Sequence, residues 1–117
     1  MRVLIALDAT PKCVEIVEEA ASRPWPTGSQ FLLLHVLDPF PFVKAPISLE
    51  RVKAAATEQL RNAARSLVHA GWKMEAVVVL GLARKVIPRI AASWKADLAM
   101  VGSNESGALT RDRKSVV

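Results

Sequence analysis

The sequence predicts an α/β fold, an open, twisted parallel sheet with helices on both of its faces. One observation is that short apolar runs alternate with segments whose apolar residues recur at helical spacing. Another is that the apolar runs are continuous, which is typical of strands buried on both sides of a parallel sheet. With 117 residues the chain suits one domain, residues 1–117.

The first apolar run, residues 3–7, ends in Asp8 and predicts the first strand. Thr10 and Pro11 then indicate a helix start. A hydroxyl can accept hydrogen bonds from the free N–H groups of a first turn, and the fixed φ of proline suits the first helical position. The spacing of four small or apolar residues predicts the buried stripe of this helix: Cys13, Ile16, Val17 and Ala20.

The middle of the chain predicts two more strands and a long helix between them. Residues 31–37 form the second apolar run, and a proline-rich loop follows it. Ser48 is the expected N-cap of the helix, which ends at Gly71. Residues 74–80, with three consecutive valines, predict the third strand.

The last part of the chain predicts a third helix and a fourth strand. The helix has an apolar stripe formed by Ile87, Ile90, Ala91 and Trp94. Pro88 lies within that stripe, so we expect a kink or a loosened first turn, because proline lacks the backbone donor. Residues 97–101 predict the fourth strand, and Gly102 opens a polar loop.

Composition excludes several classes of protein. Apolar residues make up 51% and charged residues 23%, which argues against a disordered chain. The longest apolar runs are far shorter than the roughly 20 residues of a membrane helix. A single cysteine, Cys13, cannot form an internal disulfide, and no leader pattern precedes the first strand, so we expect a cytoplasmic protein.

The net charge of +5 raises the question of a nucleic-acid or phosphate-bearing partner. Nucleic acid is disfavoured, because the chain has only three tryptophans, three phenylalanines and no tyrosine, and carries no recognition motif. Solvated helix faces account for most of the excess charge.

The candidate site follows from the predicted sheet. Such sheets bind ligands outside the carboxyl ends of the strands, where the winding order reverses, so the loops after Leu7, Val36 and Val101 are the places of interest. Asp8 would either face a ligand there or cap the next helix. Gly102 begins a loop of small residues, which lets backbone N–H groups approach an anion such as a phosphate.

Residues 3–8, 33–36 and 97–103, taken in this order and spacing, resemble the universal stress protein domain. The resemblance covers about residues 1–109. It implies a Rossmann-like sheet of order 3-2-1-4-5. In the nucleotide-binding members, ATP lies at the switch point between the first and fourth strands, so this chain would bind ATP there, with Mg²⁺ or Mn²⁺.

Carried over by position, the resemblance assigns a role to each candidate residue. Asp8 would face the ribose or a bound cation, the main chain at Val36 would bond the adenine edge, and Gly102 would approach the phosphates. The phosphate loop of the family extends the cofactor-binding set to three further positions: Ser103, Gly107 and Ser115.

Two departures from the family pattern bear on function. The second glycine position of the family's phosphate loop is Glu105 here, or is deleted if Gly107 aligns with a later glycine of the family. A carboxylate at that position repels a triphosphate. The sequence also lacks the family's last helix and strand, so we expect the sheet order 3-2-1-4 with the fifth strand missing. Residues 97–101 would then form an apolar sheet edge, which predicts a homodimer.

Two functional classes remain. The first is a stress-response regulatory domain that binds an adenine nucleotide; the second is a dimeric protein-interaction module of the same fold without a nucleotide. No catalytic residues and no metal ligands of the protein's own are predicted, since neither histidine has a second ligand at a metal spacing. His35 is expected to be a hydrogen-bonded core histidine and Cys13 a small core residue.

Overall fold

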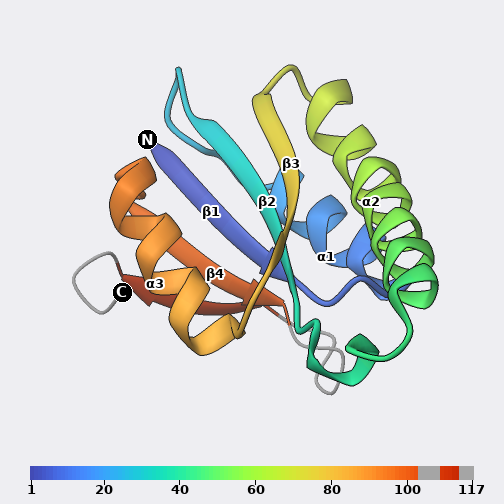
Figure 1. Cartoon of the computed structure of the whole chain (residues 1–117). Coiled ribbons are helices and arrows are strands. Elements are labelled where there is room, and N and C mark those ends of the chain that lie inside the picture. The colour runs from blue at the N-terminus through green and yellow to red at the C-terminus, as the bar shows by residue number, and fades with distance from the viewer. Residues whose placement is uncertain (103–108, 114–117) are drawn as a thin grey trace.

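Four parallel strands form most of the sheet, in the order β3-β2-β1-β4, which confirms the predicted order (Figure 1). The computed structural model describes residues 1–102 and 109–113, and it describes residues 102 and 109–113 by their backbone alone. The four strands are β1 (Arg2–Leu7), β2 (Gln30–Leu37), β3 (Lys73–Leu80) and β4 (Leu98–Gly102).

The outer edge of β4 is not free, so the prediction that this strand would be an open edge is wrong. A fifth strand, β5 (Leu109–Arg113), pairs antiparallel with β4, with Leu98 opposite Arg113 and Gly102 opposite Leu109. It differs from the parallel fifth strand of the family pattern, because an antiparallel partner needs only a short connection, whereas a parallel one needs a crossover. The expected basis for dimerisation at this edge is therefore lost.

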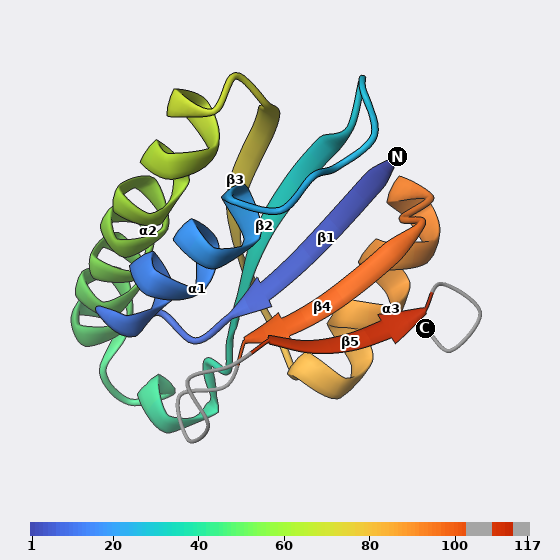
Figure 2. The same ribbon diagram turned by 180° about the vertical axis from the view of Figure 1, so that it is seen from behind.

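Three helices cover the sheet, two on one face and one on the other (Figures 1 and 2). Helices α1 (Lys12–Ala21) and α2 (Pro46–His69) pack side by side on one face, and α3 (Ala83–Trp94) crosses the opposite face. A short 3-10 helix, η1 (Phe40–Phe42), precedes α2. Among the described residues, no helix is both long and apolar enough to span a membrane.

The helix starts differ from the predicted ones. Helix α1 begins at Lys12 after Pro11, and α2 begins at Pro46, two residues before Ser48. Neither helix has a side-chain cap, so the expected capping by Thr10 and Ser48 is wrong. Prolines mark both starts because their fixed φ is already helical and their missing N–H has no partner in a first turn.

The two helices that lead into β3 and β4 end with the same hydrogen-bond pattern. After α2, Trp72 donates to the carbonyl of Leu67 (3.0 Å), and the turn residue Gly71 has φ 85°. After α3, Ala96 donates to the carbonyl of Ala91 (2.9 Å), and the turn residue Lys95 has φ 60°. This is the Schellman ending, which favours glycine at the left-handed position. The predicted helix end at Gly71 is confirmed.

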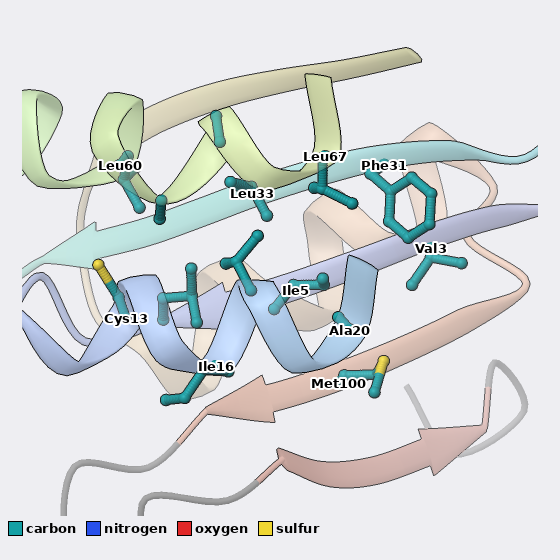
Figure 3. Close-up of a cluster of buried hydrophobic side chains, with 14 of the residues drawn as sticks. Val3, Ile5, Cys13, Ile16, Ala20, Phe31, Leu33, Leu60, Leu67 and Met100 are labelled. Carbon is teal, nitrogen blue, oxygen red and sulfur yellow. The ribbon is translucent and has the colours of Figure 1, made fainter. Parts of the chain in front are cut away.

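The larger core lies between the sheet and the α1–α2 pair (Figure 3). All of residues 3–7 are buried, as predicted for a strand covered on both faces. The predicted stripe of α1 is also buried, and Phe31 packs between Trp25 and Trp72, with ring centroids 5.5 and 5.7 Å apart. Large side chains supply this core: Ile5, Phe31, Leu33, Leu60, Leu67 and Met100.

A smaller core lies under α3. The strands β1, β2 and β4 contribute the buried residues Leu4, Leu32, Leu34 and Ala99. Ala91 of α3 and Ala96, which follows that helix, complete the core. The predicted helix is confirmed, with Pro88 inside it. Because proline has no N–H, the carbonyl of Arg84 lacks its usual helical donor.

Candidate functional site

The carboxyl ends of β1, β2 and β4 meet at the switch point of the sheet. Ala6 of β1 is opposite Leu34 of β2 on one side and Val101 of β4 on the other. Leu7 is opposite Gly102. Helices α1 and α3 cover opposite faces here, so the ends of β1 and β4 are the point at which the winding reverses.

A pocket of about 110 Å³ lies at this point. Asp8 and Val36, two of the predicted site residues, both line it. The remaining lining residues are Ala6, Leu7, Leu34, His35, Ala83, Ile87 and Val101. The structure therefore brings Asp8 and Val36 together at one pocket, and Gly102 follows the lining residue Val101 in the chain.

Three of the predicted site residues, Ser103, Gly107 and Ser115, lie outside the described residues. Glu105, the departure in the phosphate loop, lies outside them as well. Their assignment therefore stays a prediction.

Asp8 is exposed and begins the turn that leads from β1 into α1. Its backbone carbonyl accepts a hydrogen bond from the N–H of Thr10 (2.8 Å). Helix α1 has no side-chain cap. Asp8 lines the pocket, and its role toward a ligand stays a prediction.

The side chain of His35 links the ends of β1 and β2 by a hydrogen bond. Its Nδ1 lies 2.8 Å from the carbonyl oxygen of Leu7, which confirms the expected hydrogen bond of this partly buried histidine. Because a carbonyl only accepts, Nδ1 carries the proton, and in the neutral ring Nε2 keeps its lone pair. The bond holds the residue before Asp8 against β2, so His35 stabilises the shape of the pocket.

Helix α3 contributes two pocket residues that were not predicted from the sequence, Ala83 and Ile87. The available signal was Gly81, which ends β3 at the same edge as Asp8 and so places the next helix beside the switch point. The first turn of α3 also carries Arg84 and Lys85 and no acidic residue. Both cations are exposed and directly follow the pocket residue Ala83 in the chain.

The other candidate residues have structural surroundings. Cys13 is buried, and burial raises the pKa of its thiol, so it stays protonated as the predicted core residue. His69 is exposed in the last turn of α2. Within the described part of the chain, no group of three or more His, Cys, Asp or Glu side chains is placed to hold a metal ion.

Comparison with protein-family models matches residues 1–113 to the universal stress protein family. Comparison with curated protein sequences finds no significant match.

Solved structures of low sequence identity share the fold. A protein of the universal stress protein family from Burkholderia pseudomallei is 19% identical, with a TM-score of 0.68, covering 89% of this chain and 82% of that one. The universal stress protein from Archaeoglobus fulgidus is 18% identical, with a TM-score of 0.67 and coverages of 89% and 77%. A universal stress protein in complex with cAMP is 22% identical, with a TM-score of 0.62 and coverages of 89% and 73%.

Proposed function

Because the chain belongs to the universal stress protein family, we propose that it is a stress-response regulatory domain that binds an adenine nucleotide at the switch-point pocket. The observation that carries this proposal is that Asp8, Val36 and the end of β4 surround one pocket, as the family's ATP site requires. A relative that binds cAMP supports the same class of ligand. The proposed role is regulatory, without catalysis.

The size of the pocket defines how a nucleotide would sit. Sites for drug-sized ligands usually measure roughly 300–1,000 Å³. At about 110 Å³, the described pocket is far smaller than this range, so it can take the base of a nucleotide but not the whole molecule. We therefore place the adenine there, beside the main chain of Val36, and the ribose near Asp8, with the phosphates outside the pocket beyond Gly102.

Charge supports an anionic ligand at this position. Arg84 and Lys85 lie in the first turn of α3, directly after the pocket residue Ala83. Cations near a phosphate chain attract it, and a divalent cation held with Asp8 would offset the repulsion from that carboxylate. ATP with Mg²⁺ or Mn²⁺ is therefore the proposed ligand, with cAMP as the second nucleotide to test.

Thermal unfolding with and without ATP and magnesium tests this proposal. A ligand at about a hundred times its Kd stabilises the folded state by about 2.7 kcal/mol, which raises the Tm by several degrees. No shift at millimolar ATP or cAMP would refute the nucleotide function.

A matched pair of variants locates the site. Ala83→Leu adds bulk at an exposed residue that lines the pocket, so we expect it to abolish the nucleotide-dependent rise in Tm. Ala92→Leu makes the same change at an exposed position of α3 away from the pocket and should keep the shift. Equal shifts in both variants would place the nucleotide elsewhere. Asp8→Asn should reduce the dependence of binding on the metal.

The second candidate function is a protein-interaction module that binds no nucleotide. The small volume of the pocket favours it, since about 110 Å³ cannot enclose a whole nucleotide. A folded protein that shows no nucleotide-dependent Tm shift but self-associates would support this function in place of the first.

A further inference from the structure

The outer edge of β3 has no partner strand among the described residues. On its inner side, β3 pairs with β2 from Lys73 to Leu80. Gly81 then donates to the carbonyl of Leu37 (2.9 Å), so the backbone groups of odd-numbered residues are directed toward β2. Because these groups alternate along a strand, those of four residues are directed outward: Met74, Ala76, Val78 and Leu80. Such a row of unpaired donors and acceptors is a template for another strand.

The side chains of β3 do not protect this edge. Its charged residues, Lys73 and Glu75, both lie in the first half, and residues 76–80 contain no charge, proline or glycine. Ala76 is exposed, and Leu80 is 42% exposed. Edge strands of stable monomers usually carry charges, prolines or bulges, or are very short. An eight-residue edge whose last five residues are all apolar is therefore unusual for a strand that stays unpaired.

The two edges of the sheet differ in this respect. At the other edge, β5 covers β4, and the sequence of β5, LTRDR, has three charged residues out of five. Charged residues disfavour the addition of a further strand. Association through strand pairing is therefore expected at β3 rather than at β5.

Space for a partner exists beside β3. The core under α3 includes Val77 and Val79 from the second half of β3, whereas an open hollow of about 410 Å³ lies over the first half of this strand. Gln30, Lys73, Glu75 and Trp94 are among the residues that line it. In the views of the two faces, α3 lies away from the outer edge of β3 (Figures 1 and 2). Helix α3 therefore does not cover the edge.

We propose that two copies of this chain associate by antiparallel pairing of β3 with β3 across a two-fold axis, so that one sheet runs through the dimer. The unpaired groups require a β-strand as the occupant, and a two-fold axis places two edges of equal length and composition against each other. A second copy thus supplies a partner strand of the same length with the same apolar stretch, residues 76–80.

The charges limit the register to centres at Ala76, Val77 or Val78, and we place the two-fold axis at Val77, the middle of the three. Outward-directed groups must face each other, which pairs even-numbered residues with even-numbered residues. A centre at Val77 places Met74 opposite Leu80 and Ala76 opposite Val78, and the charged Lys73 and Glu75 fall at the ends, opposite uncharged residues. A centre at Glu75 would oppose two glutamates and shorten the pairing, which disfavours that register.

Disulfide trapping tests the register. In the proposed dimer the two Val77 residues form a non-hydrogen-bonded pair, in which Cβ atoms lie about 4.5–5.5 Å apart. Val77→Cys should therefore give a covalent dimer on mild oxidation. Glu75→Cys is the control. In this register residue 75 lies opposite residue 79 of the second copy, so the two introduced thiols are not adjacent and no covalent dimer should form on mild oxidation. The native Cys13 is buried and does not interfere.

Disruption of the edge tests the interface. By sedimentation equilibrium we expect a dimer for the native chain and for Ala92→Lys, which changes an exposed residue of α3. Ala76→Lys changes an exposed residue of the edge and should weaken dimerisation roughly tenfold or more, because it places lysines close to the axis. A native monomer at millimolar concentration, or unchanged association of Ala76→Lys, would overturn the proposal. A dimer in which Glu75→Cys crosslinks better than Val77→Cys would overturn the register.

Discussion

On the face of the sheet that carries α1 and α2, the core is built from large side chains, whereas the face that carries α3 uses leucines and alanines. Phe31, Leu60 and Leu67 are almost completely buried on the first face. On the second face Ala91, Ala96 and Ala99 are buried, and the helix contains Pro88. The switch-point pocket lies on the second face, between the strands and the start of α3.

The difference indicates a division of roles. Buried area and close packing supply most of the stability of a small domain, and large side chains bury more area than alanines. The α1–α2 face is therefore expected to supply most of the stability. The α3 face is thinner, and its single helix leaves room for a ligand next to Ala83. Four substitutions test this division.

The largest effect is expected for Phe31→Ala on the α1–α2 face. Phe31 is 1% exposed and packs against two tryptophans, so its removal leaves a cavity that costs about 3–5 kcal/mol in the free energy of unfolding. Denaturant titration measures this loss. Phe40→Ala is the matched control, because Phe40 is 78% exposed and should change stability by less than about 0.5 kcal/mol. Equal losses for both variants would contradict the packing described.

On the α3 face, Pro88→Ala should stabilise the protein. Pro88 is exposed, and the substitution restores the N–H that the carbonyl of Arg84 lacks. The gain is at most about 3 kcal/mol, reduced by the greater freedom of alanine in the unfolded chain. Arg89→Ala, at the exposed neighbouring position, serves as the control and should change the unfolding free energy little. A lower free energy of unfolding for Pro88→Ala would contradict this prediction and show that the proline stabilises the helix at this position.

A third substitution, Ala99→Leu, tests how closely α3 packs. Ala99 is 2% exposed in the core under α3, so a larger side chain there should cost about 1–3 kcal/mol. Ala92→Leu, on the exposed side of α3, should be close to neutral. If Ala99→Leu were as stable as the native chain by thermal unfolding, this face would be less tightly packed than its buried alanines indicate.

The smallest effect is expected at the end of α3. Lys95 adopts φ 60°, the conformation that Gly71 supplies at the end of α2. Lys95→Gly removes the steric cost of a side chain there and should stabilise the protein by about 0.5–1 kcal/mol. Lys85→Gly, inside α3, should destabilise it by a similar amount. Chemical denaturation of the two variants distinguishes these opposite signs.

Much of the fold could be predicted from local patterns. The continuous apolar run of residues 3–7 predicted a fully buried strand, and the stripe from Cys13 to Ala20 predicted the buried face of α1. Both predictions hold because periodicity reports directly which side chains must leave water. The helix starts were less predictable, since proline and hydroxyl residues both mark a first turn.

The candidate site was predictable only in part. The place of Asp8 and Val36 at one pocket was predictable, because Asp8 follows one apolar strand, Val36 lies near the end of another, and the carboxyl ends of these strands meet in a parallel sheet. Ala83 and Ile87 were missed because nothing in a helical stripe shows which end of the helix borders a pocket. The volume of that pocket is likewise a property of several elements together.

The sequence by itself determined the type of each main element, the buried stripes and the order of the parallel strands, the last through its resemblance to a family. The tertiary structure decided which strand edges are covered. After Leu109, residues 110–113 are all polar or charged. This segment has no apolar periodicity, so its pairing with β4 could not be predicted from the sequence. Hydrophobic periodicity is a local property of the chain, whereas the pairing of a polar strand, the size of a pocket and the exposure of β3 depend on contacts between distant segments.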